Sequence, residues 1–197
     1  MAATDAPRAA PSAEELEHVP GETDMWFFVV FETLVFTAYL GVYLYFRTQH
    51  ERAFLEAQSA LDLPLGIIDT TVLLTSSWAI ARCVQHMRAG RHQLARRLAL
   101  LTVGLGCIFM VLKVVEWVRL INEGHTFTSS EFMQYFFFLT GMHAIHLLIG
   151  FAALGILLYQ LADPRRRSLG TIETCATYWH TVDLFWVLIF AMLYIVR

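Results

Sequence analysis

The chain has 197 residues, of which 57% are hydrophobic and 16% are charged, and its formal net charge is -3. This composition is typical of a membrane protein with several spanning segments, and the weak net charge gives no indication of a nucleic-acid-binding surface. The length allows one helical bundle and leaves no room for a separate soluble domain. We therefore predict an all-α, polytopic membrane protein.

Residues 1–23 contain alanines, prolines and four glutamates without an apolar block. Such a segment has no core to fold around, so we expect a disordered tail. It also lacks the basic start and hydrophobic centre of a secretory signal, so the first spanning helix is expected to direct membrane insertion.

Five apolar segments follow, and each is long enough to cross a bilayer as a helix. They cover residues 24–46, 65–84, 98–121, 132–161 and 172–196. Residues 24–197 are therefore predicted to form one five-helix transmembrane domain. The loop between residues 48 and 64 is the longest, and it can form an interfacial helix with Phe54, Leu55 and Leu61 on its apolar face.

Arginines are divided unevenly between the two sides that five spans define. The side with the tail and the loops near residues 90 and 165 carries eight, and the other side carries four. Cytoplasmic loops have the excess of basic residues in membrane proteins. We therefore predict a cytoplasmic N-terminus, a cytoplasmic tail and an external C-terminus.

Small residues in the spans are interpreted as packing residues. The three cysteines match neither a zinc site nor a haem-attachment motif: Cys83, Cys107 and Cys175. Four glycines are expected to permit close helix packing: Gly104, Gly106, Gly150 and Gly155. The hydroxyls of residues 75–77 can bond to carbonyls of their own helix, so they do not require a functional site.

Ionisable residues inside a membrane span are costly and need a partner. Glu32 lies among phenylalanines and valines of the first span, so we expect it either to be protonated through desolvation or to have a partner such as His180. In the last span, Glu173, His180 and Asp183 are spaced to lie on one helix face. That face is predicted to point inward, and these four residues form the candidate buried proton site.

A second polar layer is expected on the opposite side of the membrane midplane. Lys113 and Glu116 are three residues apart, within reach of each other and of His143, and snorkelling of the lysine with an ion pair accounts for them. The spacing of His143 and His146 is compatible with metal or haem ligation, but hydrogen bonds to neighbouring helices are the favoured interpretation. With Trp179, these residues are predicted to fasten helices or contact a partner, and no metal site is predicted.

Two motifs in the fourth and fifth spans point to a family. The first is Thr140-Gly141-Met142-His143-Ala144-Ile145-His146, and the second combines Glu173 with Tyr178-Trp179-His180-Thr181-Val182-Asp183 and Trp186. In this order they resemble the signatures of subunit III of the haem-copper cytochrome c oxidases. Glu32 is similar in position to a buried carboxylate of that family, and the likeness covers all five spans.

The resemblance implies a non-catalytic accessory subunit of a haem-copper terminal oxidase in aerobic electron transport. Such a subunit holds no haem or copper, flanks the catalytic subunit I together with subunit II, supports proton uptake and complex stability, and binds structural phospholipid. The family's long form has two further N-terminal helices, so the chain is similar to the short bacterial forms. A bacterial inner-membrane location is therefore expected.

Three other functions are also compatible with the sequence. Met25-Trp26 and the stretch 69–78 look closer to the E-type accessory proteins of nitric oxide reductases, which would make reductase subunits the partners. An autonomous haem b protein would use His146 and His180 as axial ligands. A small proton or solute channel would be lined by Glu32, Lys113, Glu116 and Asp183.

Overall fold

A computed structural model describes residues 23–196, so the tail predicted over residues 1–23 lies, except for Thr23, outside the described part of the chain. Five long helices are each apolar and long enough to cross a membrane. They are α2 (Thr23–Gln49), α4 (Leu63–Arg88), α5 (His92–Asn122), α6 (Glu131–Ala162) and α7 (Leu169–Phe190), which continues as the π-helical turn η2 (Ala191–Ile195). The predicted all-α bundle of five spans is confirmed.

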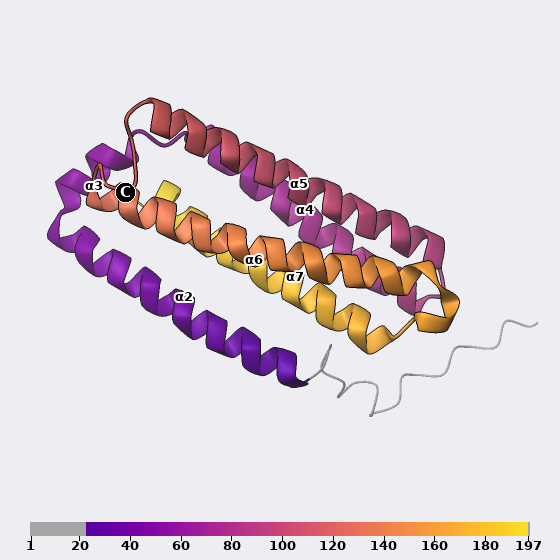
Figure 1. The fold of residues 1–197 in the computed structure, drawn as a ribbon. Helices are drawn as coiled ribbons and strands as arrows, with labels where there is room; N and C mark the ends of the chain where they lie inside the picture. The colour runs from indigo at the N-terminus through magenta and orange to yellow at the C-terminus, as the bar shows by residue number, and fades with distance from the viewer. Residues whose placement is uncertain (1–22, 197) are drawn as a thin grey trace, which may run out of the picture.

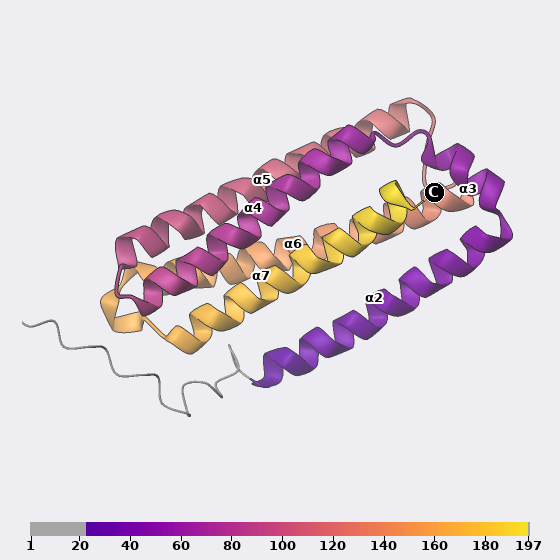
Figure 2. The same cartoon turned by 180° about the vertical axis from the view of Figure 1, so that it is seen from behind.

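The five helices run side by side along the length of the molecule, as Figures 1 and 2 show. Helices α4 and α5 form one closely packed pair, and α6 and α7 form another. Helix α7 contacts α4, α6 and α2 and is the most buried of the five, whereas α2 lies along one edge and is the least buried. Helix α7 therefore has the most central position in the bundle, where it packs against α2, α4 and α6.

Polar caps explain where several helices begin and end. The side chains of Asp62, Ser130 and Ser168 accept backbone N–H groups at the starts of α4, α6 and α7. Gly90 and Gly124 follow the ends of α4 and α5 with φ of 71° and 90°, a backbone conformation that glycine adopts without steric cost. The helices extend beyond the predicted apolar runs because these capped polar turns lie outside the hydrophobic stretch.

A short helix, α3 (Glu51–Gln58), connects α2 with α4 at the end of the bundle where the C-terminus lies (Figure 1). Phe54 is buried, which agrees with the apolar face predicted for this segment. The Gln58 amide donates to the carbonyl oxygens of Leu193 (2.9 Å) and Val196 (3.0 Å). Through these two hydrogen bonds, the short helix α3 holds the C-terminal end of the chain in place. At the opposite end of the bundle, the 3-10 turn η1 (Pro164–Arg166) connects α6 and α7.

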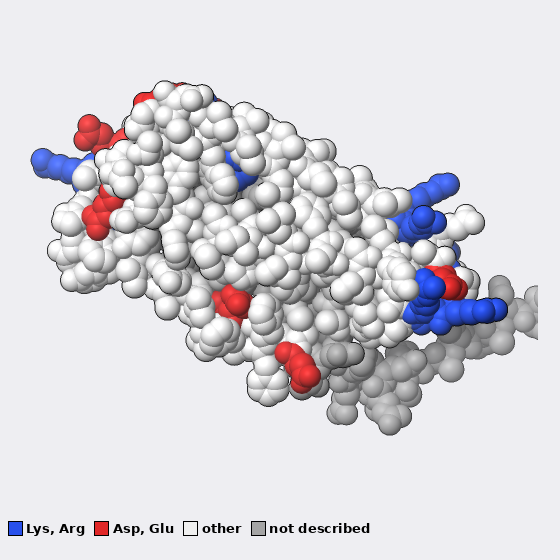
Figure 3. Space-filling model, in the orientation of Figure 1, with Lys and Arg blue, Asp and Glu red and all other residues white. Residues whose placement is uncertain are grey.

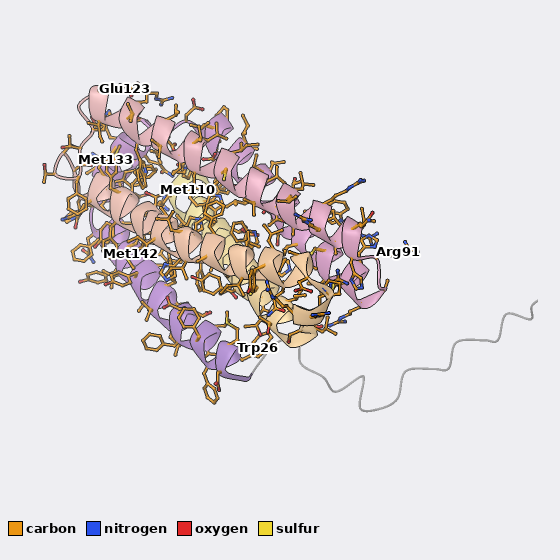
Figure 4. All side chains as sticks on the ribbon, turned by 45° about the vertical axis from the view of Figure 1, so that its right-hand side comes forward. Trp26, Arg91, Met110, Glu123, Met133 and Met142 are labelled. Atoms are coloured by element: carbon orange, nitrogen blue, oxygen red, sulfur yellow. The ribbon has the colours of Figure 1, made fainter. Side chains whose placement is uncertain are left out.

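On the face drawn in Figure 3, charged side chains gather toward the two ends, and only isolated ones lie on the largely uncharged belt between them. Arg91 and Glu123, which flank α5, lie at opposite ends in Figure 4. This distribution fits a bundle whose middle lies in the hydrocarbon core of a membrane.

Close packing around Trp179 depends on two of the four glycines named above. A Cβ atom at Gly106 or Gly150 would lie 2.9 Å or 3.0 Å from the indole of this tryptophan. Gly104 and Gly155 have no neighbour within 4 Å at that position, so the expectation of close approach was wrong for them. The Trp179 indole N–H also donates to the Ser76 hydroxyl at 3.0 Å. Three helices therefore meet at this one side chain.

Candidate functional site

Four buried polar side chains form one cluster, which we call the Lys113 cluster: Asp69, Lys113, Glu116 and Tyr194. The Lys113 ammonium lies 2.6 Å from a Glu116 carboxylate oxygen and 2.9 Å from a carboxylate oxygen of Asp69. The Tyr194 hydroxyl donates to Glu116, 2.8 Å and 2.9 Å from its two oxygens. Helices α4, α5 and η2 are thus joined by charged contacts inside the bundle.

Lys113 does not snorkel to the membrane surface, which corrects the expectation from the sequence. Its side chain is only 2% exposed, and its ammonium lies 4.3 Å from the centre of the Trp186 ring. A lysine held this deeply needs an anion and an aromatic face in place of water. Asp69, which sequence reasoning did not identify as a site residue, supplies one of the two anions.

The local sequence explains how Tyr194 reaches this cluster. A Cβ atom at Gly66 would lie 2.8 Å from the Tyr194 ring, so the missing side chain makes room for the ring against α4. Tyr194 also lies in η2, where the backbone widens from α-helical to π-helical. Such π-turns often occur at functional sites.

Glu32 and His146 form a second polar contact, between α2 and α6. The His146 Nε2 atom lies 3.1 Å from a Glu32 carboxylate oxygen, and its Nδ1 atom lies 2.8 Å from the Met142 carbonyl oxygen. The partner of Glu32 is therefore His146 and not His180, which corrects the expectation. Phe36 of α2 packs its ring edge-on at 5.5 Å from the same imidazole.

The hydrogen bonds of His146 define what this pair can do with a proton. A carbonyl can only accept, so Nδ1 must carry a hydrogen and donate to Met142. Nε2 then either accepts a hydrogen bond from protonated Glu32 or is itself protonated and faces a Glu32 carboxylate. Both arrangements contain the same single proton, and moving it across 3.1 Å exchanges one for the other. A hydrogen bond across this contact therefore requires one proton between the two side chains.

His180 faces a different partner, on α4. Its Nδ1 atom lies 2.6 Å from the Ser77 hydroxyl. Of the three hydroxyls that could bond within their own helix, Thr75 does so, donating to the Thr71 carbonyl oxygen at 2.7 Å, whereas Ser76 contacts Trp179 and Ser77 contacts His180. Asp183 is 3% exposed and faces the same serine hydroxyl, but neither of its oxygens completes a hydrogen bond with residues 23–196.

Glu173 lies nearer the end of α7 and is neutralised from α4. Two nitrogens of the Arg88 guanidinium donate to one Glu173 oxygen at 2.6 Å and 2.9 Å. Arg88 is half-exposed, whereas Glu173 is almost fully buried. The helix face that carries Glu173, His180 and Asp183 points toward the bundle, as expected. The three residues do not contact one another in a single site: Glu173 binds Arg88, His180 contacts Ser77, and Asp183 completes no hydrogen bond with the described residues.

A groove of about 520 Å³ opens beside this face of α7. It is lined by residues of α2, α4 and α7, including Trp26, Arg88 and His180. Trp26 is near the start of α2 (Figure 4). Most of the lining is apolar, and its polar groups lie along α7 and the end of α4.

His143 is enclosed by aromatic rings. It is 1% exposed, and its ring lies 5.2 Å from Trp186 and 5.5 Å from Phe109. Neither ring nitrogen has a hydrogen-bond partner within residues 23–196. Over the same residues, no three His, Cys, Asp or Glu side chains gather as a metal-binding group. Both nitrogens of His146 are occupied by protein atoms, which does not favour it as an axial haem ligand.

The cytochrome c oxidase subunit III family matches residues 21–197, which include the whole of the described bundle. The chain belongs to this family. It is 29% identical to cytochrome c oxidase subunit 3 of Bacillus sp. (strain PS3), over 86% of this chain and 83% of that protein. It is 27% identical to the probable quinol oxidase subunit 3 of Staphylococcus saprophyticus, over 87% of this chain and 86% of that one.

A third relative is a longer protein, named as a combined subunit I+III. The chain is 26% identical to the haem-copper oxidase subunit I+III of Aeropyrum pernix, over 93% of its own length but only 25% of that protein. The family expected from the motifs near His143 and His180 is therefore confirmed. The branch associated with nitric oxide reductases stays a prediction.

Proposed function

We propose that the chain is a non-catalytic accessory subunit of a haem-copper terminal oxidase, held beside the catalytic subunit I and subunit II in a bacterial inner membrane. The observation that carries this proposal is the family match over residues 21–197, together with relatives named as oxidase subunits 3. The internal geometry supports it, since Glu32, Lys113 and Glu173 each have a charged or ionisable partner within the described bundle.

The proposed contribution to proton uptake rests on the Glu32–His146 pair. It lies at the edge of the bundle, and its side chains are 15% and 9% exposed, so the proton shared by the pair is close to the outer face of α2 and α6. A neighbouring subunit on this face can exchange a proton with the pair without opening the core. The buried Glu173 and Asp183, with the half-buried His180, form the rest of the proposed proton site.

The groove beside α7 is the proposed seat of a structural phospholipid. Its apolar lining suits an acyl chain, and the half-exposed Arg88 at its rim suits a lipid phosphate. The arginine count also supports our proposal that this end, with the N-terminus, faces the cytoplasm. Proteolysis of a C-terminal tag in vesicles of known orientation tests that topology, because the tag must be cut only from the external side.

An accessory role in a nitric oxide reductase is the second candidate. It rests on Met25-Trp26 and on the stretch 69–78, in which Asp69 pairs with Lys113. The channel alternative is less well supported, because Lys113 and Glu116 are held in a closed cluster and Glu32 lies in a separate contact.

One purification decides between these functions. The tagged chain is extracted from native membranes in mild detergent, with an untagged strain as the control, and the retained proteins are analysed for haem, oxygen reduction and nitric oxide reduction. We expect a haem-bearing oxidase partner, and we expect harsher detergent to release a haem-free chain. Recovery of the chain alone, or with its own stoichiometric haem, would contradict the proposal, and nitric oxide reduction would favour the second candidate.

A further inference from the structure

We propose that the Lys113 cluster is a proton-binding site that holds Asp69 as a neutral carboxylic acid while Glu116 remains ionised. The proposal rests on the charges and hydrogen bonds of the cluster, and it does not depend on which oxidase or reductase the chain joins. Its ligand is a single proton, bound between α4, α5 and η2.

The formal charges of the cluster do not balance without this proton. Asp69 and Glu116 would bring two negative charges and Lys113 one positive charge into a volume where every side chain is 2% exposed or less. An uncompensated charge in such surroundings is strongly unfavourable, and two carboxylates sharing one site retain a proton between them. One acid in the cluster must therefore be neutral.

Among the described residues, no cation other than Lys113 forms an ion pair with Asp69 or Glu116. On α5, Arg119 donates to Asp62 at 3.1 Å and to the Ala60 carbonyl oxygen at 3.2 Å, and it also lies 3.4 Å from Glu123. Its charge is thus balanced by two acids at the end of the bundle. On α6, His143 shares two aromatic neighbours with Lys113, the rings of Phe109 and Trp186.

His143 is not the compensating cation. Both of its ring nitrogens are buried and neither has an acceptor among residues 23–196, so an imidazolium there would lack every hydrogen bond that stabilises its charge. It also faces the positive Lys113 across Trp186, which disfavours a second positive charge. The neutral imidazole leaves the charge of the cluster unbalanced.

The hydrogen bonds show which acid carries the proton. Glu116 accepts from the Lys113 ammonium at 2.6 Å and from the Tyr194 hydroxyl at both oxygens, and such donors stabilise a carboxylate. Asp69 has one short charged contact, its Oδ2 atom at 2.9 Å from the Lys113 ammonium, but neither of its oxygens has a hydrogen-bond partner among the described residues. The proton therefore resides on Asp69.

Isostere substitution in the intact complex tests this assignment. Asn has the shape of a protonated Asp, so Asp69→Asn should leave the yield of assembled protein within about twofold of the unsubstituted level. Glu116→Gln has the same steric change but removes the only ionised carboxylate and turns an amide toward Lys113, so we expect a loss of about tenfold or more. Equal losses, or a larger loss for Asp69→Asn, would overturn the proposal.

Infrared spectroscopy of the purified complex gives a second readout. The spectrum of the unsubstituted protein should contain the carbonyl stretch of a protonated carboxylic acid that Asp69→Asn lacks. This band should move when the aspartate carboxyl carbons are labelled with ¹³C and stay in place when the glutamate carboxyl carbons are labelled. If the band that is lost in Asp69→Asn moves with the glutamate label, or if no band is lost, Asp69 is ionised and the proposal is wrong.

Discussion

The Lys113 cluster and the Glu32–His146 pair both place ionisable groups inside the membrane, but they differ in how they are enclosed. The first lies between α4, α5 and η2, with side chains that are at most 2% exposed. The second joins α6 to the peripheral α2, and its carboxylate is 15% exposed. The enclosed cluster is suited to holding helices and a fixed proton, and the edge pair is suited to exchange with a neighbouring subunit.

The largest effect is expected from removing the central cation. Lys113→Met leaves two buried carboxylates without their counter-charge, and breaking a buried ion pair from one side costs about 3 to 5 kcal/mol. The thermal unfolding midpoint of the purified protein in mild detergent should fall steeply. Val111→Leu, two residues away on the exposed side of α5, is the matched control and should leave it unchanged. A small effect of Lys113→Met would show that the cluster does not hold the helices together.

A glycine pair sharpens the comparison by testing packing without charge. Gly106→Ala forces a methyl group against the rings of Trp179 and Phe151, which would lie 2.9 Å and 3.0 Å from the added carbon, and overpacking of this kind costs about 1 to 3 kcal/mol. Gly104→Ala, in the same helix with no neighbour within 4 Å, should not destabilise the protein. The difference between the two unfolding midpoints measures how closely Trp179 packs against α5. Equal midpoints would exclude close packing there.

A substitution in the Glu32–His146 pair should lower stability less than one in the Lys113 cluster, but it should affect proton uptake more. Glu32→Gln removes the shared proton but leaves a polar group of the same shape at a partly exposed position, so we expect a loss on the order of 1 kcal/mol. Proton uptake by the assembled complex should be slowed, because a glutamine side chain cannot exchange a proton with His146. The exposed Glu51→Gln serves as the control for a lost negative charge. Unchanged uptake in the Glu32 variant would remove this pair from the proposed function.

The sequence was sufficient to predict the spans and the family, because apolar length and ordered motifs are visible in one dimension. It was not sufficient to pair the polar groups. Glu32 was expected to meet His180 but meets His146, and Lys113 was expected to snorkel but meets Asp69. Which residues face each other depends on how each helix is rotated and which helix is its neighbour. Hydrophobic spans that are apolar on every side carry little information about either.

The smallest effect is expected at the rim above the Lys113 cluster, where Arg119 lies 3.4 Å from Glu123. Both side chains are more than a third exposed, so water and salt screen their attraction, and such pairs contribute about 0 to 1 kcal/mol. Glu123→Gln should therefore shift the unfolding midpoint only slightly, and added salt should abolish the shift. A large or salt-independent loss would mean that Arg119 needs Glu123 as well as Asp62 to stay balanced. The positive charge of Arg119 would then act on the Lys113 cluster. The sum of charges from which we assigned a proton to Asp69 would have to include Arg119.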